Sequence, residues 1–194
     1  MQSAFLRLSR LMAWLGGAML TLLILLVCAS VVGREINSIL HGDLATRLAP
    51  AFAAWLLDLG IGPVNGDFEL VEAGIAFSIF AFLPLCQITG GHASVDVFTN
   101  YLPDGFNRGL RLVTDLVFAA VMVLLAWQLW LGLLSKKSSG QTTFLLEMPV
   151  WWAYALSLVG AVVAAGVACY IAAVRVRETL TGTAILPDDL GAEH

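Results

Sequence analysis

Three acidic side chains at the edges of apolar runs are the residues of this sequence most capable of chemistry. Glu69 and Glu72 are three residues apart, so they share one face of a helix, and Asp115 stands near the start of a later run. An acid inside a membrane helix can relay protons or bind a cation, but that role favours a position near the bilayer midplane. A carboxylate at a helix N-terminus is instead favoured by the helix dipole and stays close to water. We therefore expect Glu69 and Glu72 to have an interface or capping role.

A second candidate pair is His92 and Asp96, which are four residues apart in the segment Gly-Gly-His-Ala-Ser-Val-Asp. On a helix they would face the same way, but two ligands do not make a metal site. We expect Ser94 or Asp96 to cap a short helix while His92 packs at the interface. The other two histidines lie outside the apolar runs and the three cysteines stand singly, so neither a haem pair nor a thiol redox pair is indicated.

No nucleophile, base and orienting group occur together, so we expect no enzymatic activity, no metal and no cofactor. Of the 194 residues, 59 % are hydrophobic and only 12 % are charged, and the mean hydropathy is +0.87. The net charge of −4 argues against a nucleic-acid binder. This composition is typical of an integral membrane protein embedded in the lipid bilayer.

Four apolar runs are long enough to cross a bilayer core of about 30 Å, which needs about 20 helical residues. Glu72 and Asp115 are the only charged residues within them. The sequence thus predicts an all-α membrane protein with four transmembrane helices, at 11–32, 70–89, 112–134 and 150–174.

We expect residues 1–178 to form one domain, followed by a solvated tail at 179–194. In the long first loop, apolar residues recur at helical spacing over 44–59, which predicts an amphipathic helix at the membrane interface. Six basic residues lie on the side of the two tails and four on the other side. Because basic residues favour the cytoplasm, we expect both termini to be cytoplasmic.

Small residues recur every four positions along the fourth run, at Gly160, Ala164 and Ala168. Such a row lets another helix approach closely, which is a main source of helix association in lipid. We expect this face to pack tightly, either within the chain or against a partner.

Several short motifs occur in a fixed order along the chain, namely Arg34, Phe68-Glu69-Leu70, Gly91-His92-Ala93-Ser94-Val95-Asp96, Leu102-Pro103, Arg108, Thr142-Thr143, Met148-Pro149-Val150-Trp151 and Gly160. This order resembles the small four-helix membrane subunit of TRAP transporters, the tripartite ATP-independent periplasmic systems (DctQ-like family). One departure is the long step from Arg34 to Glu69.

The resemblance implies an accessory, scaffolding role in sodium-coupled uptake of organic acids across the bacterial inner membrane. The partners it implies are a large multi-span permease, which holds the sodium and substrate sites, and a periplasmic substrate-binding protein. It also makes Arg34, Glu69, His92 and Asp96 candidates for structural or partner-interface contacts. The position of Glu72 at a helix end and the small-residue row add Glu72, Gly160, Ala164 and Ala168 to these candidates.

One alternative from another functional class stays open. A small homo-oligomeric transporter or channel could work alone, with Glu72 or Asp115 as the coupling acid. A neighbouring gene for a large permease would favour the accessory role, and an isolated gene would favour this alternative.

Overall fold

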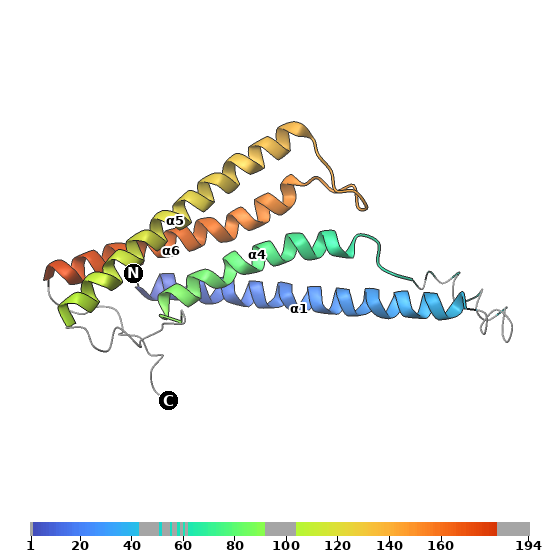
Figure 1. Cartoon of the computed structure of the whole chain (residues 1–194), viewed down its shortest axis with the longest axis horizontal. Helices are drawn as coiled ribbons and strands as arrows, with labels where there is room; N and C mark the ends of the chain where they lie inside the picture. Colours follow the sequence, from blue (N-terminus) through green and yellow to red (C-terminus); the bar gives the residue numbers. More distant parts are fainter. Residues whose placement is uncertain are drawn as a thin grey trace, which may run out of the picture.

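The computed structural model describes residues 2–42, 62–91 and 104–181, with residues 51, 55, 58 and 60 in the first loop. Within this part of the chain there are four helices, and each is long and apolar enough to cross a membrane (Figure 1). This confirms an all-helical chain with four potential membrane spans. The helices are α1 (Gln2–Leu40), α4 (Asp67–Ile88), α5 (Asp104–Ser139) and α6 (Trp151–Thr181).

Three of the helices extend well beyond the apolar runs that predict them. At 1.5 Å per residue, the 39 residues of α1 reach about 58 Å, whereas a bilayer core is about 30 Å thick. The 22 residues of α4 reach about 33 Å and match that thickness. Hydropathy identifies only the part of a helix that suits the hydrocarbon core. The backbone hydrogen bonds of the helix continue beyond that part into more polar sequence.

The four helices pack in the order α1, α4, α6, α5 (Figure 1). A close approach between α6 and α4 occurs at Gly160, where an added Cβ would lie 2.9 Å from the Cβ of Phe80. Between α6 and α5, Ala164, Ala168 and Met122 belong to one buried cluster. Small residues on α6 therefore let it serve as the central helix, in contact with a neighbour on each side.

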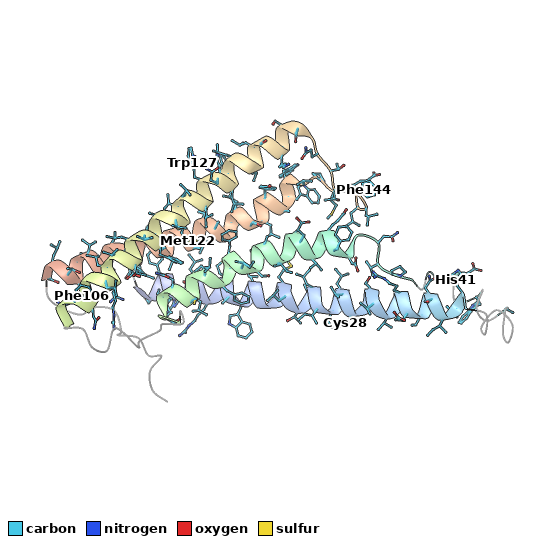
Figure 2. All side chains as sticks on the ribbon, viewed as in Figure 1. Cys28, His41, Phe106, Met122, Trp127 and Phe144 are labelled. Carbon is cyan, nitrogen blue, oxygen red and sulfur yellow. The ribbon has the colours of Figure 1, made fainter. Side chains whose placement is uncertain are left out.

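Large apolar side chains cover the outside of the bundle. Trp14 on α1 is 81 % exposed and Trp127 on α5 is 61 % exposed, whereas Met122 is buried at 2 % (Figure 2). A water-soluble protein would not leave so much apolar surface in contact with solvent. This arrangement suits a bundle whose outer surface meets lipid or other apolar helices.

Three expectations from the sequence lie partly or wholly outside the described residues. Segment 44–59 is described only at residues 51, 55 and 58, and no interfacial helix is shown. His92 and Asp96 lie outside the described residues, as does the tail beyond Thr181. The predicted tail boundary at 179 falls inside α6, which continues to Thr181.

Candidate functional site

Glu69, in the first turn of α4, holds the loop that joins α5 to α6. One oxygen of its carboxylate accepts the N–H of Leu145 at 2.8 Å, and the other accepts the N–H of Leu146 at 3.0 Å. The residue is only 8 % exposed. Glu69 does not cap its own helix, since the N-cap of α4 is Gly66 and no side-chain hydrogen bond caps it. The carboxylate therefore connects the start of α4 to two loop residues that follow it by 76 and 77 positions in the sequence.

The loop itself, residues 140–150, is a small folded turn. Thr142 and Pro149 form an isolated antiparallel bridge, and the N–H of Thr143 donates to the carbonyl of Met148 at 2.8 Å. The hydroxyl of Thr143 accepts the N–H of Met148 at 3.2 Å. Glu147 has a φ of 52°, a left-handed conformation that non-glycine residues seldom adopt. Several contacts together hold the turn in this shape.

A further contact seats the loop on the start of α4. A Cβ on Gly66 would lie 2.4 Å from the Cγ of Leu146, so only glycine leaves room for that leucine. Gly66 also has a φ of 77°, which glycine adopts without strain. The loop and the start of α4 thus fit together through Gly66 and Glu69.

At the same end of the bundle, Arg34 lies beside Asp67 rather than Glu69. The Arg34 guanidinium is 3.9 Å from Asp67, and its side chain is 62 % exposed. The hydroxyl of Ser30 donates to Asp67 at 2.5 Å and accepts the N–H of Val64 at 3.3 Å. An ion pair this exposed contributes little stability, so Ser30 is the stronger link between α1 and the start of α4.

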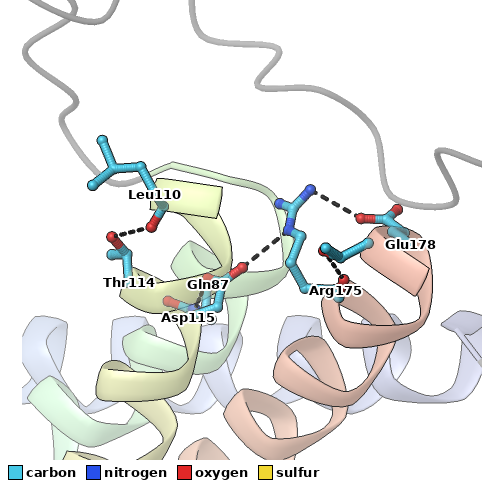
Figure 3. Close-up of polar contacts among 7 residues, drawn as sticks. Gln87, Leu110, Thr114, Asp115, Arg175 and Glu178 are labelled. Carbon is cyan, nitrogen blue, oxygen red and sulfur yellow. Dashed lines mark hydrogen bonds and ion pairs between the residues drawn. The ribbon is translucent and has the colours of Figure 1, made fainter. Parts of the chain in front are cut away.

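The opposite end of the bundle contains a second polar cluster, centred on Arg175 (Figure 3). Its Nε lies 3.0 Å from a carboxylate oxygen of Asp115, and its Nη1 lies 3.2 Å from Glu178. The amide of Gln87 donates to the other oxygen of Asp115 at 3.2 Å. The Arg175 and Asp115 side chains are 16 % and 15 % exposed. This cluster joins α4, α5 and α6.

Arg175, Gln87 and Glu178 are functional candidates that the sequence reasoning missed. A signal was present, because Arg175 and Glu178 are three residues apart directly after the last apolar run. The other acid singled out from the sequence, Glu72, lies exposed on α4. It belongs to neither of the two polar clusters.

The small-residue row of α6 is buried inside the chain. Gly160 packs on α4, while Ala164 is 2 % exposed and Ala168 is fully buried. These residues therefore pack against neighbouring helices of their own chain. Two exposed positions of α6, Cys169 and Ala173, help to line an apolar groove of about 720 Å³ between α5 and α6.

In chemical terms, both polar clusters hold helices together. In each cluster the charged side chains pair with an opposite charge, with an amide or with backbone N–H groups of the same chain. Among the described residues, no group of three or more His, Cys, Asp or Glu side chains could hold a metal ion.

The model of a family described as "Tripartite ATP-independent periplasmic transporters, DctQ component" matches residues 23–182. No curated protein and no solved structure matches the chain. The family match covers all of α4, α5 and α6 and the second half of α1, together with both polar clusters.

Proposed function

The chain belongs to the family of DctQ components of tripartite ATP-independent periplasmic (TRAP) transporters, and from this premise we propose that it is a static scaffold in the uptake of an organic acid. Family membership implies a tripartite complex with DctM and DctP components. In this proposal the large permease component carries the substrate and sodium sites, and the binding protein delivers the carboxylate. This chain supports the permease in the membrane.

The observation that carries the proposal is the absence of charge in the middle of the helices. None of residues 11–33, 73–88, 116–135 and 151–174 is Asp, Glu, Lys or Arg. Ionisable side chains within membrane helices mark the pathways of ions and charged substrates. The polar clusters lie at the two ends and hold helices, which suits a scaffold.

The orientation belongs to the same proposal. The start of α1, the end of α4, the start of α5 and the end of α6 lie together at one end of the bundle (Figure 1). Among the basic residues that the structure describes, six lie at that end and three at the other, namely Arg7, Arg10, Arg108, Arg111, Arg175 and Arg177 against Arg34, Lys136 and Lys137. Basic residues are retained on the cytoplasmic side, so loop 140–150 would face the periplasm and the protein would sit in the inner membrane.

A self-contained homo-oligomeric transporter is not favoured by this geometry. Asp115 would have to leave Arg175 and Gln87 before it could act as the coupling acid. Glu72 lies less than two turns into α4, where it is close to water.

The test is to express the chain with its genomic neighbours, purify the complex in mild detergent through a tag on this chain, and identify the co-purified proteins by mass spectrometry. We expect a stoichiometric large permease, and transport in liposomes only when permease and binding protein are both present. Recovery of this chain alone as a homo-oligomer that moves solute would overturn the proposal. The variant Glu72→Gln serves as a control, because the scaffold role predicts unchanged transport.

A further inference from the structure

A groove of about 540 Å³ lies on the surface of α1 beside α4. The residues that line it include Arg10, Trp14, Gly17 and Thr21 of α1, and Leu85 contributes from α4. The α1 residues are three or four positions apart, so they follow one face of that helix. The groove therefore runs along the axis of α1, from one end of the bundle toward its middle.

The groove is charged at one end and apolar along the rest of its length. Arg10 is exposed, and no contact among the described residues involves its guanidinium. The hydroxyl of Thr21 at the far end already donates to the carbonyl of Gly17 at 2.9 Å. The other lining residues are Ala, Gly, Leu and Trp. An occupant that matches this groove is anionic at one end and hydrocarbon beyond it.

The length of the groove matches one leaflet of a bilayer. From Arg10 to Thr21 α1 rises about 16 Å, and half of a hydrocarbon core of about 30 Å is about 15 Å. Arg10 directly precedes the apolar run 11–32, so its guanidinium lies where the lipid headgroups begin. Trp14, one turn deeper, is 81 % exposed, and tryptophan favours this interfacial level. The groove thus extends from the headgroups to near the bilayer midplane.

We propose that this groove binds an anionic phospholipid, whose phosphate pairs with Arg10 while an acyl chain lies over Gly17 toward Thr21. An arginine guanidinium binds phosphate oxygens through two parallel hydrogen bonds. Basic pockets between membrane helices bind anionic lipid headgroups. Arg7 is exposed one turn before Arg10 on the same helix face and adds positive charge. The site is independent of the proposed function, and only its assignment to the cytoplasmic leaflet rests on the proposed orientation.

Other grooves and other occupants lack this match. None of the residues that line the groove between α5 and α6 is charged, so that groove suits any hydrocarbon surface. A transmembrane helix of the permease could fill the apolar part of the groove beside α1, but it would have to bring an acid of its own to Arg10. A phospholipid supplies the anion and the hydrocarbon in one molecule, at the spacing that the groove has.

The experiment is photo-crosslinking with a phosphatidylglycerol that carries a diazirine in its acyl chain, added to the purified complex of this chain with its permease. Mass spectrometry of peptides measures labelling of α1, and unlabelled phosphatidylglycerol or phosphatidylcholine competes. We expect phosphatidylglycerol to compete at the lower concentration. In Arg10→Gln that concentration should rise about fivefold, toward the value for phosphatidylcholine. Arg177→Gln, which removes an exposed arginine at the same end of the bundle, is the control and should compete as the wild type does.

A second pair of variants tests the apolar part of the groove. A Cβ at Gly17 meets nothing within 4 Å, so Gly17→Leu fills the groove without disturbing the packing of α1 on α4. We expect it to abolish the labelling of α1. Gly166→Leu on α6, where a Cβ also meets nothing within 4 Å, is the matched control and should keep that labelling. Co-purification of the permease and thermal unfolding show that both variants are folded.

The outcomes separate this proposal from the proposed function. Equal competition by the two lipids on the wild type would reject the anionic lipid site, and so would undiminished labelling of α1 in Gly17→Leu. Loss of the permease from Gly17→Leu but not from Gly166→Leu would assign the groove to the permease and would also reject the site. A wild-type chain that retains no permease would reject the proposed function, and labelling of the chain alone would then decide the lipid site in the same way.

Discussion

The guanidinium of Arg175 on α6 lies 3.0 Å from the carboxylate of Asp115 on α5, and this ion pair joins two helices at residues 60 positions apart. Gln87 extends the contact to α4, and Glu178 binds the other side of the guanidinium. A charge pair that is mostly shielded from water is stable only with such additional hydrogen bonds. The cluster therefore acts as a cross-link among three helices.

Breaking this cross-link should destabilise the bundle. Asp115→Asn leaves Arg175 without one of its two carboxylates, and we expect the free energy of unfolding to fall by about 2 kcal/mol. Unfolding in mixed micelles, followed by circular dichroism, measures the change. Arg177→Gln, which alters an exposed charge on the same helix, is the control and should have little effect. Equal stabilities of the Asp115→Asn variant and the wild type would show that the pair is not a structural link.

Removing the Glu69 carboxylate should free the loop without unfolding the helices. In Glu69→Ala the N–H groups of Leu145 and Leu146 lose their acceptors, so their hydrogen exchange should become faster. Hydrogen-exchange mass spectrometry of peptides from loop 140–150 measures this. Glu72→Ala should leave the exchange of the loop as in the wild type. Slow exchange in the Glu69 variant would mean that the Thr143 and Met148 contacts suffice to hold the loop.

The spacing between α6 and α4 depends on Gly160. A leucine there would clash with the Cβ of Phe80 and force the helices apart, so we expect Gly160→Leu to cost roughly 1–3 kcal/mol. Gly166→Leu is a matched control on the same helix, because a Cβ at Gly166 meets nothing within 4 Å. Thermal unfolding of the two purified variants compares them. A stable Gly160→Leu chain would contradict the close packing described here.

The proposed orientation is tested by labelling single cysteines in intact cells, after the three native cysteines have been replaced. His41 and Arg177 are both exposed, and they lie near opposite ends of the bundle. We expect His41→Cys to react with an impermeant maleimide from outside, and Arg177→Cys to react only after permeabilisation. The reverse pattern would place loop 140–150 in the cytoplasm.

The four helices were predictable because nothing but a helix of about 20 apolar residues satisfies its own backbone across the bilayer. Their ends were not predictable from hydropathy. In α5, for example, Asp104 to Arg111 and Ser135 to Ser139 are helical although they lie outside the apolar run. Backbone hydrogen bonds between successive turns stabilise these ends, and a hydropathy profile does not detect such bonds.

The polar contacts show a sharper limit of sequence reasoning. Glu69 stood out by its position, but its partners are backbone N–H groups, which every residue except proline has. Arg175 counted only as one of the basic residues near the C-terminus. Its pairing with Asp115 depends on how α5 and α6 pack, because the packing decides which residues of the two helices lie side by side.

Of the four helices, α4 is joined by polar contacts to the α5–α6 hairpin near both of its own ends, through Glu69 and through Gln87. Because these two attachment points are far apart along α4, both of them oppose displacement of α4 along its own axis. Sliding the α5–α6 hairpin past α4 by a single turn would have to break bonds at both ends of α4 at once. When a neighbouring protein shifts along the membrane normal, α4, α5 and α6 would therefore keep their positions relative to one another.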